Sequence, residues 1–430
     1  MGGTSLCMYF VTNINQCLES DNAPRDVNDI NKFNYKSQKP LSKILKRYLS
    51  FKKNLNLINA YWNYYRRTSV ISNYPIQAFI EPTTNCNLHC PACPTGLRLS
   101  DRHRGTLTLE KFKILIDEIG DYLFILHMYN WGEPTLHLKF PEMIKYASDK
   151  GIFIITSSNF SVKLSDEYVR KIVYSGLDVL LLSIDGITQE TYSRYRKGGN
   201  LNIVLENLKK LHDIKIETSV KTPVIIWKFH VFKHNEHEIE DLKNIYKILG
   251  ADELITTRAY VPNDSEEIQA TTNPLYPPIS TYKPQTKTCS QLYCTFVHNP
   301  DGLVSPCCGL SSVNLDFSIY KNGVLKTMNT NKFINARMFF KNQYKICYDK
   351  INVNDNGLRL NTNLHESGIV CLQCPTPNLQ DGAMNIMPYF LGDIFVNLIK
   401  PNLSEYRQEY LRTKWLHWKT MTTNINKIIK

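Results

Sequence analysis

Cys86, Cys90 and Cys93 form the pattern with the clearest chemistry in this sequence, because they lie within eight residues of one another. One short stretch, which we call the first cysteine loop (residues 86–93), can present all three thiolates to a soft metal centre. Three thiolates leave one iron of a four-iron cluster open, and an open coordination position distinguishes a reactive centre from a structural one. The spacing therefore predicts a reactive iron–sulfur centre.

A structural zinc site is the alternative for this loop. Zinc also binds thiolates, but its closed structural sites have four ligands. His89 could supply the fourth ligand, although it stands too close to Cys90 in the sequence to share one tetrahedral centre comfortably. More distant cysteines could also serve, but they are needed elsewhere.

A second group of cysteines follows much later in the chain. Asp301-Gly302 predicts a hairpin between two apolar stretches, and that hairpin could bring two of these cysteines together. A later C-x2-C pair is spaced to share one metal. Cys308 could replace its neighbour as a ligand, and a zinc ribbon is the structural alternative. The complete four-thiolate set is Cys289, Cys307, Cys371 and Cys374.

The remaining cysteines carry less information. Ten of the twelve fall in the two zones just described, and clustered cysteines in a large chain of a reducing compartment indicate metal rather than disulfides. Cys7 and Cys17 are interpreted as thiols without a function. Cys294, Cys308 and Cys347 could serve a further cluster, but a full second set would need more cysteines at fitting spacing, so one cluster is favoured here.

The segment between residues 76 and 260 must position the first cysteine loop. Its patterns alternate between strands and helices, which implies parallel strands with right-handed crossovers. About six such units predict an open, partial α/β barrel with its site at the carboxyl ends of the strands. The expected strands are Ile76–Glu81, Phe124–Tyr129, Ile152–Thr156, Val179–Ile184, Val224–Val231 and Glu253–Tyr260. The expected helices include Leu109–Ile119, Pro141–Ser148, Ser165–Tyr174, Leu201–Leu211 and Glu236–Leu249.

The C-x3-C-x2-C loop after a first strand resembles that of radical S-adenosylmethionine (SAM) enzymes, and the resemblance covers most of residues 76–380. Three further stretches resemble family motifs and follow in the expected order at predicted strand ends. They are Gly132-Glu133-Pro134 (GGEP, with Trp131 replacing the first glycine), Thr156-Ser157-Ser158-Asn159 (TNG, imperfectly) and Ser183-Ile184-Asp185-Gly186 followed by Arg194 and Arg196 (SIDG…YxxxR).

The resemblance implies a fold, two cofactors and a set of contacts. The first cysteine loop would hold a 4Fe-4S cluster that binds SAM. The GEP stretch would meet the amino group of the methionine moiety, although Glu133 could instead start a helix. Ser183 and one downstream arginine would contact the methionine carboxylate, since a guanidinium can grip a carboxylate through two bonds. The sequence cannot separate Arg194 from Arg196, and either could be a surface charge. The implied SAM-binding set is Gly132, Glu133, Pro134, Ser158, Asn159, Ser183, Asp185, Arg194 and Arg196.

The later cysteines also resemble a known arrangement. Gly302 and Cys307 match the G-x4-C element of the SPASM or twitch domain, which follows many radical SAM enzymes. The resemblance implies an auxiliary 4Fe-4S cluster. The fold class expected for the whole is α/β, with a partial (β/α)6 TIM-like barrel followed by a small cysteine-rich SPASM/twitch-like domain.

The activity implied is reductive cleavage of SAM to a deoxyadenosyl radical that abstracts hydrogen from a substrate. An external reductant of the flavodoxin or ferredoxin type would supply the electron. The favoured substrate is a peptide that is oxidised, epimerised or crosslinked. The alternatives are dehydrogenation or epimerisation of a sugar or other small alcohol, and a non-catalytic zinc or iron–sulfur scaffold. The sequence assigns no side chain the role of catalytic acid, base or hydrogen donor.

An amphipathic helix is expected over residues 40–67, with apolar residues at helical spacing and basic residues on the other face. A basic amphipathic helix can lie on a membrane surface or bind an acidic peptide. The favoured interpretation is a helix packed on the catalytic domain with a solvated basic face. The apolar residues are Leu41, Ile44, Leu45, Tyr48, Leu55, Ile58, Trp62 and Tyr65.

The expected organisation has six segments. They are a loosely ordered segment (1–38), a basic helical arm (39–75), the barrel (76–260), a proline-rich linker (261–288), the SPASM/twitch-like domain (289–380) and a helical tail (381–430).

Composition and charge argue against several classes of protein. The formal net charge of +12 is compatible with an acidic partner, but no nucleic-acid motif is present, so nucleic acid is not expected. No apolar run is long enough to span a membrane, and the N-terminus lacks the layout of a secretory signal. The expected location is the cytoplasm.

Overall fold

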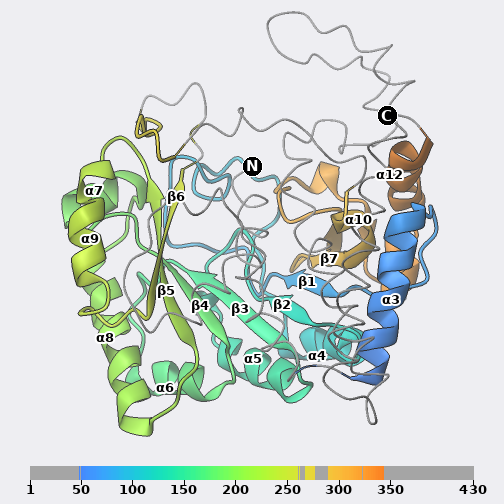
Figure 1. Ribbon diagram of the computed structural model, residues 1–430, viewed down its shortest axis with the longest axis horizontal. Coiled ribbons are helices and arrows are strands. Elements are labelled where there is room, and N and C mark those ends of the chain that lie inside the picture. Colours follow the sequence, from blue (N-terminus) through green and yellow to red (C-terminus); the bar gives the residue numbers. More distant parts are fainter. Residues whose placement is uncertain are drawn as a thin grey trace, which may run out of the picture. The chain divides into compact units, whose positions relative to one another are not determined.

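The computed structural model describes residues 48, 50–259, 261, 267–276, 289–321 and 323–342. In this part of the chain, nine strands form one sheet in the order β6-β5-β4-β3-β2-β1-β7-β8-β9 (Figure 1). The strands are β1 Gln77–Ile80, β2 Ile125–His127, β3 Phe153–Ser158, β4 Val179–Ser183, β5 Val224–Val231, β6 Glu253–Arg258, β7 Thr295–His298, β8 Leu303–Ser305 and β9 Ser318–Ile319.

Strands β1 to β6 pair in chain order, and every pair is parallel. All six expected strands are present, with ends that differ by a few residues. The carboxyl ends of parallel strands meet at one edge of the sheet, so the loops that follow β1 to β4 start side by side. The predicted α/β partial barrel, followed by antiparallel strands in the cysteine-bearing segment, is confirmed.

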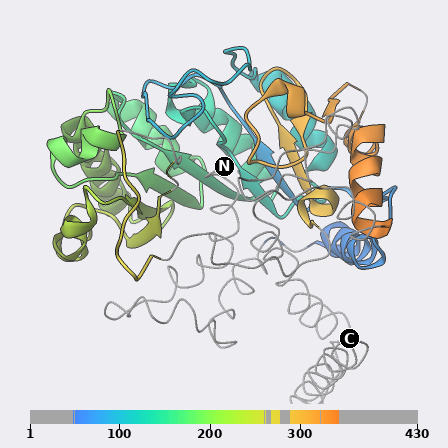
Figure 2. The same cartoon turned by 90° about the horizontal axis from the view of Figure 1, so that it is seen from above.

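Helices connect the strands and cover one face of the sheet (Figures 1 and 2). The helices between the strands bury an apolar face, as for Phe112, Leu115 and Ile116 of α4. The N-caps are polar, since Thr108, Ser165 and Asn200 accept backbone N–H groups at the starts of α4, α6 and α8. The helices are α3 Phe51–Arg66, α4 Leu109–Ile119, η3 Pro134–Leu136, α5 Phe140–Asp149, α6 Asp166–Tyr174, α7 Gln189–Tyr195, α8 Leu201–Thr218, η4 Glu236–Glu238, α9 Ile239–Ile245, α10 Gln291–Cys294, η6 Val313–Leu315, α11 Val324–Met328 and α12 Asn331–Asn342.

The other face of the sheet is more polar near the carboxyl ends of the strands. The strand register places four polar residues on this face. Ser183 pairs with Lys228, and residues two apart along a strand share a face, so the face also holds Ser157, opposite Leu181, and Thr257, two residues after Ile255. The Ser157 and Ser183 hydroxyls lie 3.4 Å apart. This polar row gives the barrel a face suited to binding a polar molecule.

The cysteine-bearing segment after residue 289 joins the same sheet. Strand β7 pairs in parallel with β1, from Gln77 opposite Thr295 to Ile80 opposite His298. No local pattern predicts this pairing, because β7 looks like an ordinary apolar stretch after a proline-rich segment. The two cysteine regions are therefore connected by backbone hydrogen bonds, while the predicted domain boundaries stay predictions.

The predicted hairpin at Asp301-Gly302 is confirmed. Strands β7 and β8 pair antiparallel, with Val297 opposite Ser305, and β9 pairs with β8. Gly302 has a φ of 84°, a conformation that a side chain disfavours, which explains glycine at this turn.

Helix α3 lies within the expected helix at 40–67, but its orientation differs from the favoured interpretation. Leu55, Ile58, Trp62 and Tyr65, expected to pack inward, are exposed, while Lys53 is buried. The physical reason is that polar side chains of α3 bind backbone groups of the catalytic domain. Lys53 Nζ donates to the carbonyl oxygen of Gly151.

Several predicted features fall outside the described residues. They are the segment 1–38, the tail 381–430, most of the linker 261–288, and Cys7, Cys17, Cys347, Cys371 and Cys374. No helix in the described residues has both the length and the apolar character needed to cross a membrane.

Candidate metal and cofactor site

The first cysteine loop follows β1 and folds as a compact turn. The Cys93 N–H donates to the carbonyl oxygen of Cys90 at 3.1 Å. Gly96 lies directly against this turn, since a Cβ on it would stand 2.5 Å from the Cys90 nitrogen. Cys90 is buried, while Cys86 and Cys93 are half-buried. The turn places three thiols at the carboxyl edge of the sheet.

Donors from other elements point at two of the sulfurs. Asn159 Nδ2 lies 3.8 Å from Cys86 Sγ, and the Leu88 N–H lies 3.5 Å from the same sulfur. An Arg196 guanidinium nitrogen lies 3.9 Å from Cys90 Sγ. Such donors stabilise negative charge on sulfur, which is the state that binds iron.

Burial disfavours the thiolate forms of Cys86 and Cys90. Burial, with the nearby Glu133 charge, raises the pKa of Cys86 to about 12. Burial raises the pKa of Cys90 to about 11, although the Arg196 charge acts in the opposite direction. A metal centre that binds here must therefore displace protons and supply positive charge in their place.

Three thiols with nitrogen donors directed at two of them suit an iron–sulfur cluster. Within the described ranges, no three His, Cys, Asp or Glu side chains converge to hold one metal ion. A single zinc ion needs ligands that meet at one point. In an iron–sulfur cluster each thiolate binds a different iron, so the ligands stand further apart. The nitrogen donors directed at the Cys86 and Cys90 sulfurs are also compatible with an iron–sulfur cluster.

Glu133 lies at the centre of a hydrogen-bond network beside this loop. Its Oε1 accepts from the Thr135 N–H at 3.0 Å, from the Thr135 hydroxyl at 2.6 Å and from the Ser158 hydroxyl at 2.6 Å. Its Oε2 accepts from the Asn159 N–H at 2.7 Å. Burial raises the pKa of Glu133, and these donors oppose that rise. Glu133 is also the N-cap of η3, which begins at Pro134, so the helix-start interpretation describes its local geometry.

Asn159 connects this network to the first cysteine loop. Its Nδ2 contacts Cys86 Sγ and also donates to Asn87 Oδ1 at 3.1 Å. Its Oδ1 accepts from the Ser161 N–H at 2.8 Å. The end of β3 is thus fixed directly against the loop after β1.

The structure separates the two arginines that the sequence could not. Arg196 Nε donates to Asp185 Oδ2 at 2.6 Å, in a pair whose side chains are 13% and 0% exposed. Asp185 Oδ1 accepts from the His230 N–H, which fixes the carboxylate. Arg194 is exposed and lies 3.5 Å from Glu190 on the same helix, α7. Of the two, Arg196 is the one brought to the first cysteine loop.

Glu81 is a residue of this site that sequence reasoning missed. Its Oε1 accepts from the backbone N–H groups of Trp131 and Gly132, each at 2.7 Å. Gly132 packs closely here, because a Cβ would stand 1.9 Å from the carbonyl oxygen of Thr83. Burial raises the pKa of Glu81 to about 7, against the lowering effect of these two N–H groups. The sequence feature that could have identified Glu81 is an acidic residue at the end of a buried apolar strand.

The hairpin segment carries the second group of cysteines. We call residues 299–316 the second cysteine segment. Cys308 is buried against Phe79 and Val297, whereas Cys307 is half-buried. The two neighbouring cysteines thus differ in exposure, and the choice between them as a ligand stays a prediction. Cys289 and Cys294 are buried at the two ends of the turn that contains α10.

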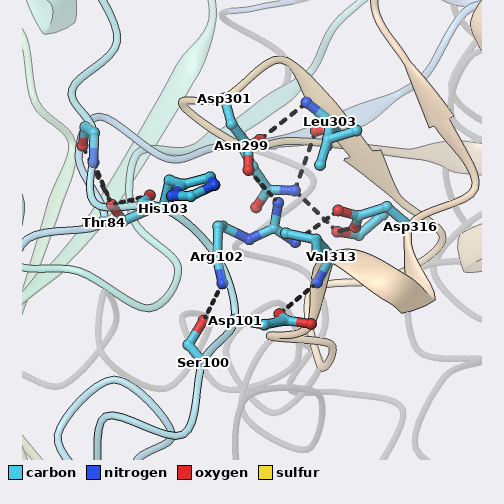
Figure 3. A network of polar contacts seen from close by, with 12 residues as sticks. Thr84, Ser100, Asp101, Arg102, His103, Asn299, Asp301, Leu303, Val313 and Asp316 are labelled. Atoms are coloured by element: carbon cyan, nitrogen blue, oxygen red, sulfur yellow. Dashed lines mark hydrogen bonds and ion pairs between the residues drawn. The ribbon is translucent and has the colours of Figure 1, made fainter.

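A buried arginine joins the two cysteine regions (Figure 3). Arg102 follows the first cysteine loop, and its guanidinium lies 2.8 Å from Asp301 Oδ2 and 2.8 Å from Asp316 Oδ2. The neighbouring Asp101 accepts from the Val313 N–H at 2.8 Å. The sequence had not singled out Arg102, since its partners stand about two hundred residues away.

Trp131 makes a further connection. Its Nε1–H donates to the carbonyl oxygen of Leu310 at 3.0 Å, while its backbone N–H is held by Glu81. The tryptophan that replaces the first glycine of the GGEP pattern therefore contacts the second cysteine segment. A glycine could not make this contact.

Comparison with known proteins bears on the barrel. The radical SAM superfamily model matches residues 80–244. Among curated proteins, the chain is 29% identical over 182 residues to AdoMet-dependent heme synthase of Methanosarcina barkeri, covering 42% of this chain and 50% of that protein. It is 27% identical over 191 residues to PqqA peptide cyclase of Bradyrhizobium diazoefficiens, covering 44% and 48%. The chain thus spans about half the length of these relatives.

A solved structure supports the fold over a longer stretch. The crystal structure of Streptococcus suis SuiB bound to S-adenosylmethionine is similar with a TM-score of 0.50 and 12% identity, covering 78% of each chain. The matched superfamily residues run from the end of β1 into α9 and contain the first cysteine loop, Glu133 and Asp185. Residues 80–244 of this chain therefore form a radical SAM domain.

Proposed function

We propose that this protein cleaves SAM reductively at a 4Fe-4S cluster held by Cys86, Cys90 and Cys93, and abstracts hydrogen from a peptide substrate. One observation carries the proposal. Asn159 and Arg196 come from motifs distant in the sequence, and both place nitrogen donors at sulfurs of the first cysteine loop. Asn159 directly follows β3 and Arg196 directly follows α7, so both donors come from the stretches that resemble the SAM-binding motifs of the family.

When bound, the cluster supplies the electron that breaks the carbon–sulfur bond of SAM and yields the deoxyadenosyl radical. The chain's own residues bind and orient SAM. Glu133, fixed by four donors, holds the GEP turn for the amino group of the methionine moiety. Ser183 and Arg196 are the candidates for its carboxylate, and Asp185 keeps the Arg196 guanidinium in place. Cys90 and Glu133 are buried, and their burial would help to protect a radical from side reactions.

We assign the oxidation, epimerisation or crosslinking of a peptide as the reaction class. Two relatives support this choice by name: PqqA peptide cyclase, and the antilisterial bacteriocin subtilosin biosynthesis protein AlbA of Bacillus subtilis, which is 27% identical over 180 residues. The electron for each turnover would come from a flavodoxin- or ferredoxin-type reductant in the cytoplasm.

We also assign one auxiliary 4Fe-4S cluster to Cys289, Cys307, Cys371 and Cys374, in a SPASM/twitch-like domain. The confirmed hairpin and the half-buried Cys307 support this assignment, and Cys371 and Cys374 lie outside the described residues. Such a cluster could accept an electron from the substrate radical or hold the segment together.

The test is anaerobic purification followed by iron and sulfide counts and a deoxyadenosine assay after reduction. The variant with Cys86, Cys90 and Cys93 replaced by Ala is expected to lose one cluster and all deoxyadenosine formation. Cys17→Ala is the matched control and should retain both. Replacing Cys371 and Cys374 should remove a different cluster and spare part of the deoxyadenosine. Zinc in place of iron, or no deoxyadenosine from the reconstituted wild type, would refute the proposal.

The substrate class has its own readout. Small peptides encoded beside this gene can be coexpressed with the enzyme, and their masses can be measured by mass spectrometry. Loss of hydrogen mass, or deuterium uptake at one carbon without a mass loss, is the expected result. Product formed only from a sugar or other small alcohol would overturn the peptide assignment while leaving SAM cleavage intact.

A further inference from the structure

Helix α3 presents a continuous apolar stripe to solvent. The five stripe residues recur at intervals of four, three, four and three, which places them on one face of a helix. Large apolar side chains exposed together on one face mark an interaction site rather than an ordinary surface. The stripe residues, with their exposed fractions, are Phe51 (68%), Leu55 (49%), Ile58 (39%), Trp62 (56%) and Tyr65 (68%).

The opposite face of α3 fixes this orientation through polar contacts. Asn56 accepts from the Tyr74 N–H at 2.8 Å and donates to the Tyr74 carbonyl oxygen at 3.0 Å. Asn63 donates to Asn73 Oδ1 at 2.9 Å, and Lys53 donates to the Gly151 carbonyl oxygen. Turning the stripe inward would leave these buried polar groups without partners, which is costly. The outward stripe is therefore built into the fold.

The stretch of sequence that contains α3 carries charge of one sign. No Asp or Glu occurs between Asp29 and Glu81. On α3 itself, the Arg66 guanidinium lies over the Trp62 ring at 5.4 Å, and the exposed Lys52 pairs with Asp121. The same stretch of sequence contains ten basic residues: Lys32, Lys36, Lys39, Lys43, Lys46, Arg47, Lys52, Lys53, Arg66 and Arg67.

We propose that α3 docks on an anionic lipid surface, with the apolar stripe inserted at the level of the headgroups. A helix with an aromatic and aliphatic face beside basic residues has the composition of an interfacial helix. Trp and Tyr favour the boundary between headgroups and chains, and Lys and Arg are attracted to anionic lipids. A bilayer also needs no complementary groove, which suits a single helix face. This site is separate from the proposed SAM chemistry.

The test is sedimentation of the full chain with vesicles, which needs no bound cluster. Vesicles of phosphatidylcholine alone are compared with vesicles of equal parts phosphatidylglycerol and phosphatidylcholine. The wild type should bind the anionic vesicles, and Leu55→Ser with Trp62→Ser should weaken binding about tenfold or more, since both side chains leave the interface. Ile248→Ser is the matched control, because Ile248 is 82% exposed away from α3 and should bind as the wild type does.

Added salt should weaken binding, because lipid charge is screened. Thermal unfolding shows whether the double variant keeps its fold, and Phe51→Ser replaces it in the test if it does not. Equal binding to neutral vesicles, or unchanged binding of the stripe variants, would overturn the proposal. So would a wild-type dimer that the stripe variants convert to monomer, since the stripe would then join two copies of this chain. Loss of deoxyadenosine formation tests the proposed function alone and does not affect this result.

Discussion

The two cysteine regions are held in place by different kinds of structure. The first cysteine loop lies where the carboxyl ends of parallel strands meet, and it receives contacts from Asn159 after β3 and from Arg196 after β4. Strand β7 extends the sheet beyond β1, and the second cysteine segment after it is bonded to Arg102 and Trp131, which follow the first loop in the sequence. The first region is therefore held by contacts within the barrel, and the second region is held by contacts with residues that follow the first loop.

Because the two regions are held differently, substitutions in them should disturb different parts of the molecule. Loss of a contact inside the barrel should affect the first cysteine loop alone. Loss of Arg102 should release the second cysteine segment and disturb the chain next to the first loop as well (Figure 3). Substitutions in the two regions can therefore be compared directly.

Arg102→Met should have the largest effect. The Arg102 and Asp316 side chains are each 2% exposed, so the change leaves a buried carboxylate without its cation. Removing one member of a buried pair costs about 3–5 kcal/mol. We expect this loss in the free energy of unfolding, measured with denaturant on protein without clusters. Arg170→Met breaks an exposed pair with Glu217 and should change stability by less than about 1 kcal/mol. Equal effects of the two substitutions would show that Arg102 does not join the regions as described.

Glu81→Gln should change the pH dependence of stability in the barrel. Burial raises the pKa of Glu81 from an ordinary 4.5 to about 7, so the folded state holds a proton that the unfolded state releases. The stabilisation is complete below about pH 4.5 and is lost as the pH rises to about 7, by about 3 kcal/mol. The wild type should therefore lose stability relative to Glu81→Gln across this interval, in denaturant unfolding at several pH values.

Glu217→Gln is the control for this measurement, because Glu217 is exposed and should track the wild type. A constant difference between wild type and Glu81→Gln from pH 4 to pH 8 would contradict a raised pKa. An effect confined to the second cysteine segment would contradict the assignment of Glu81 to the barrel.

Much of the barrel could be predicted from the sequence. Alternating strand and helix patterns gave all six parallel strands, and Asp301-Gly302 gave the hairpin, because periodicity and turn chemistry are local properties. The stretches that hold Glu133, Asn159 and Asp185 were found by resemblance in the order of the chain. The structure brings Glu133 and Asn159 together and places Asp185 with Arg196 beside Cys90.

Contacts between distant residues could not be predicted. The β1–β7 pairing, the Arg102 ion pairs and the Trp131 contact join residues far apart in the sequence, and no local pattern specifies such partners. The predicted orientation of α3 was wrong for a related reason. Hydrophobic periodicity identifies an apolar face, but the buried hydrogen bonds of Asn56 and Asn63 decide which face packs inward.

Trp131→Phe should have the smallest effect and tests the link between the regions most finely. The change keeps an aromatic ring but removes the Nε1–H bond to the Leu310 carbonyl oxygen, which is worth about 1 kcal/mol. Hydrogen exchange should increase at the amides near Leu310 and stay unchanged in β3 and β4. Trp62→Phe is the matched control, because Trp62 is 56% exposed on α3 and should leave both regions unaffected. Faster exchange throughout the barrel would mean that Trp131 supports the first region as strongly as the second, and the asymmetry between the two would no longer hold.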